Sequence, residues 1–235
     1  MKAYFIGCSH TYGDDLKDPT NQAWPAVLSK KMGYEFVNDA VSGGTNDRIL
    51  YRTIKHLDQF DHFYIAWTYT SRFTRYRSDN NHDVNYNPAL KHRLYQNNSD
   101  FLYYGRIHYA IYHNELYAFK LWLQQILCLQ SVLNCHRKPY TMLNAVENLV
   151  PKWCVPWKDF NNSIHDLVCF DSMNDQQLED EHQEITQLVS KIDLSRFPGW
   201  SNFWLTQLHN HYPVGVTGHL LDEGQIAYTD WILAQ

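Results

Sequence analysis

Ser9 is the residue near the start of the chain whose type and setting suit nucleophilic chemistry. It follows the short apolar run Ala3–Ile6, which we interpret as a buried strand, and it lies between Gly7 and Gly13. Glycines at these positions let the backbone turn sharply and leave space beside it. A serine at the carboxyl end of a first parallel strand lies where such sheets expose reactive groups. The alternative is that Ser9 only caps a turn or the next helix.

A serine nucleophile needs a base within hydrogen-bond reach, and His219 is our candidate for that base. It lies in the segment from Pro213 to Gln225, which leads into a predicted final helix ending near Leu233. The alternative is a histidine at a helix start that bonds only to backbone. His209, His211 and His219 could also suggest a metal site. No matched cysteine or carboxylate pattern accompanies them, so we predict no metal and no cofactor.

Gly43 is the candidate for a backbone donor in the same site. It follows a predicted second strand, Tyr34–Asn38, and precedes a predicted helix capped by Thr45 or Asn46. A glycine lets the backbone approach a substrate carbonyl without an intervening Cβ, and each donor to an oxyanion can contribute about 3–4 kcal/mol. The alternatives are an ordinary turn or a phosphate-binding turn. The phosphate alternative is weaker because the chain lacks both glycine-rich phosphate motifs at this point.

Polar residues also follow the predicted third strand, His62–Trp67. The hydroxyl of Thr68 could donate a further hydrogen bond to an oxyanion. Asn46, Thr70 and Arg72 are candidate substrate-binding residues at the same expected edge of the sheet. The alternative for Arg72 is a surface charge on a loop.

The run GCSHTYG, from Gly7 to Gly13, resembles the first block of the GDSL, or SGNH, hydrolases. In that family the nucleophilic serine lies in a G-D-S-x-(T)-x-G run, so Ser9 falls on the nucleophile and Cys8 on the usual aspartate. The turn at Gly43 resembles the second block, in which a glycine N–H forms part of the oxyanion hole. The asparagine of the third block, G-x-N-D, has no counterpart in this chain.

The last block of the family, D-x-x-H-P-x-x-x-G-H, can be aligned in two ways. Placing His219 on the catalytic histidine keeps the spacing to the final helix, and we prefer it. Leu220 then replaces the proline, and Val216 stands where an aspartate should orient the imidazole. The other alignment places Tyr212–Pro213 on the H-P pair and leaves a tyrosine at the catalytic position.

Without that aspartate, the orientation of His219 depends on a backbone carbonyl or on another carboxylate. Asp222 and Glu223 are close in the sequence, although the helix could point them away.

The resemblance implies a flavodoxin-like, three-layer α/β/α SGNH-hydrolase fold with a central parallel sheet. It implies an esterase or deacylase in which Ser9 attacks an ester carbonyl, His219 takes its proton, and the N–H groups of Ser9 and Gly43 hold the oxyanion. The chain also resembles short GDSL-like proteins encoded by tailed phages of marine bacteria, so esters of host cell-wall or surface glycans are expected substrates. The second hypothesis is a non-catalytic module of this fold that binds a glycan or a virion partner.

Composition limits the other classes of function. The chain has 235 residues, 44% of them hydrophobic, which is enough for one sizeable core, and we expect a single domain. The net charge of −5 offers no general attraction to nucleic acid or to an anionic membrane. The five cysteines form no C-x-x-C pair, which indicates a reducing compartment. With no apolar leader and no long apolar run, we expect a cytoplasmic protein, in the host cytoplasm or a virion if phages encode it.

Periodicity predicts the elements that must position these residues. We expect helices at about Trp24–Met32, from about Thr45 to Leu57 with Leu50, Ile54 and Leu57 inward, at Glu115–Leu133 and at Asp175–Ile192, and a further strand at Tyr140–Ala145. Residues 73–114 are polar and rich in tyrosine, with little periodicity, and we interpret them as an insertion over the carboxyl edge of the sheet. A second irregular loop is expected at 149–171.

Overall fold

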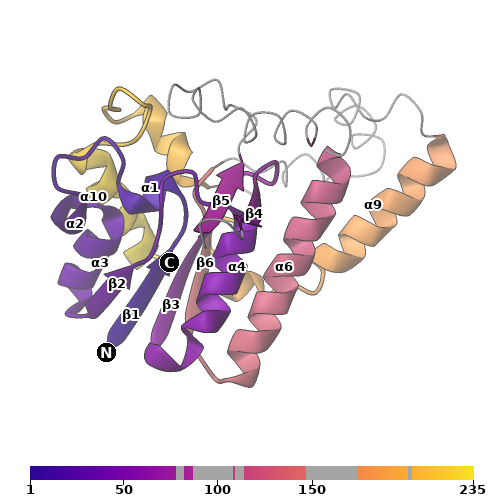
Figure 1. The fold of residues 1–235 in the computed structure, drawn as a ribbon, viewed down its shortest axis with the longest axis horizontal. Coiled ribbons are helices and arrows are strands. Elements are labelled where there is room, and N and C mark those ends of the chain that lie inside the picture. The colour runs from indigo at the N-terminus through magenta and orange to yellow at the C-terminus, as the bar shows by residue number, and fades with distance from the viewer. Residues whose placement is uncertain (78–81, 87–107, 109–113, 147–173, 201–202) are drawn as a thin grey trace.

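A computed structural model of the chain describes residues 1–77, 82–86, 108, 114–146, 174–200 and 203–235 (Figure 1). Its centre is a parallel sheet of four strands in the order β2-β1-β3-β6. The strands are β1 (Lys2–Ile6), β2 (Glu35–Asn38), β3 (His62–Trp67) and β6 (Tyr140–Asn144). The first strand is therefore central, and the chain reverses its direction of travel across the sheet after β2. This order is the flavodoxin-like one, in which sites form at the carboxyl ends of the strands beside that reversal.

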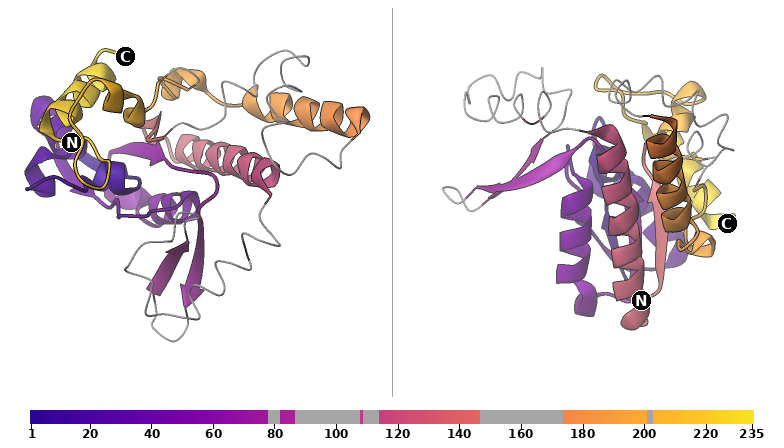
Figure 2. Two further views of the ribbon diagram at one scale, coloured as in Figure 1. Left: turned by 90° about the horizontal axis from the view of Figure 1, so that it is seen from above. Right: turned by 90° about the vertical axis from the view of Figure 1, so that its right-hand side faces the viewer.

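Helices cover both faces of the sheet, which makes the fold the expected three-layer α/β/α arrangement (Figure 2). On one face lie α3 (Trp24–Met32) and α10 (Asp222–Leu233). On the other lie α4 (Asn46–Lys55) and α6 (Glu115–Cys135), with α9 (Asp175–Val189) packed against α6. Strands buried on both faces read as continuous apolar runs, and this explains why β1 and β3 were predictable from the sequence.

Each face of the sheet has its own apolar core. On the side of α4 and α6, the indole of Trp122 stacks on Trp200 at 5.5 Å between ring centroids. On the side of α3 and α10, Phe5 of β1 packs edge-to-face on Trp24 at 5.3 Å.

Local capping explains where two of the helices begin. The side chain of Thr45 accepts a hydrogen bond from the N–H of Arg48, which confirms Thr45 as the cap of α4. At α9, Asn174 and Gln177 form a reciprocal capping box.

Short elements complete the described chain. They are α1 (Ser9–Tyr12), α2 (Pro19–Gln22), and the 3-10 turns Leu57–Gln59, Leu194–Arg196 and Leu205–Asn210.

The first part of the expected insertion is more regular than the sequence suggested. Phe73–Arg77 (β4) and His82–Tyr86 (β5) pair as an antiparallel hairpin, which projects from the side of the molecule that carries α4 (Figure 2). This hairpin could not be predicted from the sequence, because its two strands are polar and show no clear apolar periodicity. Apart from residue 108 and Asn114, the rest of 73–114, and the loop expected at 149–171, lie outside the described residues.

Over the part of the chain that the structure describes, no helix combines the length and apolar character needed to cross a membrane.

Candidate active site

Ser9 is the first residue of α1 and lies three residues beyond Ile6, the last residue of β1. Its side chain is buried, with 5% of the residue exposed, and its hydroxyl makes no hydrogen bond to any described residue. Gly7 and Gly13 bound the turn as the sequence suggested. A Cβ added to Gly7 would lie 2.3 Å from the hydroxyl of Thr11, and Gly13 ends α1 in the left-handed region with φ of 96°.

The two glycines after β2 have different roles. Gly43 adopts a φ of 71°, a conformation that favours glycine, and a Cβ there would meet nothing within 4 Å. Gly44 has an ordinary φ, but a Cβ on it would lie 2.6 Å from the carbonyl oxygen of Gly7 and 3.3 Å from the Cα of Cys8. The glycine pair therefore lets the second loop lie directly against the turn that presents Ser9.

We expect Gly44→Ala to displace this turn. The added methyl group has no room beside two backbone atoms, so we expect a loss of about 1–3 kcal/mol in the free energy of unfolding, as in overpacked sites. A displacement near 1 Å at Ser9 is expected to lower any hydrolytic rate by roughly 100-fold. Urea unfolding and an ester assay measure the two effects. Ser42→Ala is the control for stability, since Ser42 is an exposed residue of the same loop. An alanine at position 44 with native stability and rate would contradict the close approach.

His219 lies in a tight turn just before α10, closed by a bridge between Val214 and Leu220. The turn wraps around the carboxylate of Asp15, a residue of the loop after α1. One oxygen of Asp15 accepts hydrogen bonds from the N–H of Thr217 at 2.9 Å, the hydroxyl of Thr217 at 2.8 Å and the N–H of His219 at 3.2 Å. The same oxygen lies 3.5 Å from Nδ1 of His219, and the Thr217 hydroxyl lies 2.9 Å from that nitrogen.

No feature of the sequence predicts this contact between Asp15 and His219. Asp15 precedes His219 by 204 residues and sits in a polar loop with other acidic residues. Asp222, one of the two carboxylates considered from the sequence, accepts a hydrogen bond from Gln22 at 2.7 Å instead. In the structure, the backbone of Asp15 has a φ of 70°, which is uncommon for a residue other than glycine.

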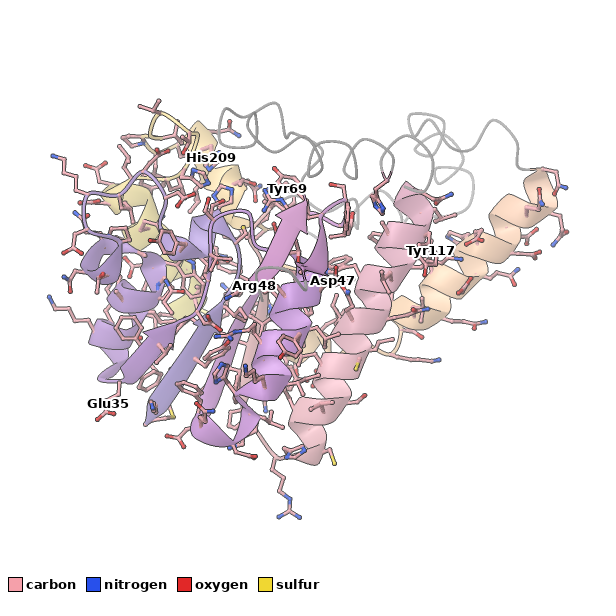
Figure 3. The ribbon with its side chains drawn as sticks, viewed as in Figure 1. Glu35, Asp47, Arg48, Tyr69, Tyr117 and His209 are labelled. Atoms are coloured by element: carbon pink, nitrogen blue, oxygen red, sulfur yellow. The ribbon has the colours of Figure 1, made fainter. Side chains whose placement is uncertain are left out.

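Three histidines meet at this edge of the sheet. The ring of His10 lies 4.5 Å from that of His219 and 5.6 Å from that of His209, between centroids. Figure 3 labels His209 at the end of the molecule where the strands terminate. Burial, followed by the charges of His219, His209 and Arg72, lowers the pKa of His10 well below its ordinary value. Burial and His219 also lower the pKa of His209. Both imidazoles are therefore neutral at neutral pH.

Among the described residues, no group of histidine, cysteine or carboxylate side chains has the arrangement of a metal site.

The third loop is tied to the start of α4. The Asn46 side chain donates to the carbonyl oxygen of Thr68 at 3.0 Å and accepts from the N–H of Thr68 at 2.9 Å. The amide of Asn46 thus holds backbone, while the buried Thr68 hydroxyl accepts a hydrogen bond from Nη1 of Arg72 at 3.1 Å and keeps its own proton to donate. Arg72 also donates to the carbonyl oxygen of Gly44 at 3.3 Å.

Asn46, Thr70 and Arg72, the predicted substrate-binding residues, line one pocket of about 110 Å³. The pocket lies between the end of the third loop and the starts of α4 and α6, where Figure 3 labels Asp47 and Tyr117. Its apolar wall comes from Phe73 and from the α6 residues Ala118, Leu121 and Trp122. Arg72 therefore connects this pocket to the glycine loop beside Ser9.

Solved structures similar to this chain include proteins of the lipolytic G-D-S-L family and an esterase. A G-D-S-L family protein from Desulfitobacterium hafniense DCB-2 has 14% identity and a TM-score of 0.47, covering 98% of this chain and 97% of that one. A member of the lipolytic protein G-D-S-L family from Veillonella parvula DSM 2008 has 11% identity and a TM-score of 0.44, with coverage of 99% and 97%. The psychrotrophic esterase EstA from a Pseudoalteromonas species has 12% identity and a TM-score of 0.36, with coverage of 81% and 97%.

A comparison with the curated proteins found no match. The model of a family of unknown function, DUF6071, matches residues 13–152, a stretch that contains Asp15 and the loops after β2 and β3 but neither Ser9 nor His219. Because this match spans more than half of the 235 residues, the chain belongs to the DUF6071 family.

Proposed function

We propose that this protein is a serine ester hydrolase with Ser9 as nucleophile and His219 as base. The observation that carries the proposal is the ring contact at 4.5 Å between His219 and His10, the residue next to Ser9. It brings a C-terminal imidazole to the turn that presents an N-terminal hydroxyl, at the carboxyl ends of parallel strands. Such an edge is where this class of sheet places its sites.

The reaction would proceed through an acyl-enzyme. The Ser9 hydroxyl attacks the ester carbonyl carbon while His219 takes its proton, and the C–O bond of the tetrahedral intermediate then breaks as His219 returns the proton to the departing alcohol. Water, deprotonated by His219, then attacks the acyl carbon, and the bond from this carbon to the Ser9 oxygen breaks as His219 returns the proton to that oxygen and the carboxylic acid leaves. No cofactor takes part in these steps.

Three donors are available for the oxyanion of this intermediate. The N–H groups of Ser9 and Gly43 bond to no described residue, and the Thr68 hydroxyl retains its proton. Preorganised donors of this kind are the largest source of rate enhancement in acyl transfer. Thr68 takes the place of the asparagine that the resemblance would require.

The pocket beside Arg72 supports a small acyl group as part of the substrate. At about 110 Å³, it is smaller than the cavity of about 150 Å³ that is known to hold benzene. The guanidinium of Arg72 at its rim can bond to hydroxyl or carboxyl groups of the rest of the substrate. We therefore propose short-chain esters, such as acetylated surface glycans of bacteria, as the substrate class.

A fluorophosphonate probe tests the nucleophile, because it forms a covalent bond with an activated serine. We expect stoichiometric labelling of the native protein, detected as a mass increase, and no labelling of Ser9→Ala. Ser42→Ala is the matched control, since Ser42 is an exposed serine on the neighbouring loop that bonds to Asp14, and it should label normally. Absence of labelling in the native protein, or labelling that persists in Ser9→Ala, would contradict the proposal.

The second candidate is a binding module without turnover. Two observations favour it: Cys8 replaces the aspartate in the first block of the GDSL family, and Ser9 is buried. The same probe separates the two candidates, because a binding module leaves Ser9 unmodified.

A further inference from the structure

We propose that Asp15 is the carboxylate that orients His219, acting through the hydroxyl of Thr217. The inference rests on the proposed function. In the GDSL family the orienting aspartate stands three residues before the histidine, at the position of Val216, whereas here the loop after α1 would supply it. Asp15 is a positioning residue in this scheme, because it acts on His219 and does not contact the substrate.

The hydrogen-bond geometry fixes where the protons lie. A threonine hydroxyl has one proton, and that of Thr217 points to the Asp15 carboxylate at 2.8 Å. The hydroxyl oxygen of Thr217 also lies 2.9 Å from Nδ1 of His219. Because its one proton is already donated to Asp15, this oxygen can only accept a hydrogen bond from that nitrogen. We therefore assign the imidazole proton to Nδ1, which leaves a free lone pair on Nε2. That tautomer is the one a general base needs when Nε2 faces the nucleophile.

The chain around Asp15 is built to hold this arrangement. A Cβ added to Gly215 would lie 2.3 Å from the Cβ of Asp15, so only glycine lets the turn close over the carboxylate. The turn is locked by a hydrogen bond of 2.8 Å from the N–H of Gly215 to the carbonyl oxygen of His219. Gly218, with φ of 85°, provides the reversal between Thr217 and His219.

Electrostatics favour the same assignment. Burial alone would raise the pKa of Asp15, but the hydrogen bonds from Thr217 and from the N–H of His219 outweigh burial and lower it. Asp15 is thus ionised at neutral pH. The other groups that face the imidazole are His10 and His209, both neutral, so Asp15 is the charged side chain in contact with His219 among the described residues.

Nitrogen-15 NMR of the histidine rings tests the assignment without depending on activity. The native protein has 13 histidines, and the signals of His219 are identified by their absence in His219→Gln. We expect a protonated Nδ1 and an unprotonated Nε2 for His219 at neutral pH. A native protein with the proton on Nε2 would overturn the proposal, whatever the variants do.

Asp15→Asn and Thr217→Val test the two links. Asp15→Asn is expected to mix the two tautomers and to lower ester hydrolysis by about 100-fold. Thr217→Val removes the hydroxyl that joins the groups and is expected to cost about tenfold. Asp14→Asn is the matched control, since this neighbouring carboxylate bonds to Ser42 on the other side of the loop, and it should change neither property.

A merely structural role for Asp15 would lower the unfolding temperature of Asp15→Asn and leave the tautomer of the folded protein unchanged, which would contradict the proposal. If Asp15→Asn does not fold, an unchanged tautomer in Thr217→Val contradicts the relay. The hydrolase proposal has a separate test. A native protein that the fluorophosphonate does not label would contradict that proposal, yet it could still show the expected tautomer of His219.

Discussion

Replacing His219 by alanine is expected to lower kcat/KM for p-nitrophenyl acetate by roughly 10³- to 10⁴-fold. Without the imidazole, the Ser9 proton has no acceptor in the attack and the alcohol has no donor when it leaves. His10 cannot take over, because its ring is buried and its pKa is held well below the ordinary value, so it is too weak a base.

The matched control for this variant is His211→Ala. His211 is an exposed histidine eight residues earlier in the same C-terminal segment, and its removal should leave the rate within about twofold of native. Thermal unfolding of both variants shows whether the fold is retained. Equal rates in His219→Ala and His211→Ala would show that His219 is not the base.

The largest effect on stability is expected for Trp24→Ala, at about 3–5 kcal/mol in the free energy of unfolding. Trp24 is completely buried, and its ring packs edge-to-face on Phe5 at 5.3 Å and on Tyr228 at 5.5 Å. The backbone N–H of Trp24, which an alanine would keep, donates to the side chain of Gln225 at 3.0 Å. Trp24 thereby joins β1 to the helix that follows His219, so its loss leaves a cavity between them.

Urea unfolding followed by circular dichroism measures this effect. Tyr51→Ala is the control, since this aromatic residue on α4 is 56% exposed and its removal should change the free energy of unfolding by at most about 0.5 kcal/mol. Similar losses in the two variants would contradict the assignment of Trp24 to the core.

The sheet could be predicted from the sequence because its strands are short apolar runs followed by turn residues. His62–Trp67 agrees with the predicted boundaries, and the helix predicted from Glu115 extends to Cys135. Both signals depend only on neighbouring residues, either a continuous apolar run or a 3.6-residue period. The pairing of the polar strands β4 and β5 had no such signal.

The prediction of which residues of α4 face the core was wrong in part. Of the three residues predicted to face inward, Leu57 is buried and Leu50 packs against the core, but Ile54 is 40% exposed. The buried residues of α4 itself are Asn46, Ile49 and Thr53. Two of these are polar, and burial is tolerated because the Thr53 hydroxyl donates to the carbonyl oxygen of Ile49 at 2.7 Å and Asn46 pairs with the backbone of the third loop. Apolar periodicity alone cannot detect polar residues that are satisfied in this way.

The candidate site was predictable to the extent that it depends on chain order. A serine after the first strand, a glycine turn after the second and a histidine before the last helix are each local features, and the parallel sheet brings their loops to one edge. Asp15, the partner of His219, could not be predicted in this way. Asp15 reaches it through a turn whose closure depends on Gly215 and on three hydrogen bonds, and neither can be inferred from residue types along the chain.

Strand β1 of the sheet begins at Lys2, whereas His219 lies in the turn from Pro213 to Leu221, more than 200 residues later. On a ribosome, Ser9 is therefore made 210 residues before His219. A nascent chain arrested before residue 213 contains all four strands of this sheet but lacks the proposed base. Hydrolysis would therefore report that translation has passed His219, and not merely that the sheet has assembled.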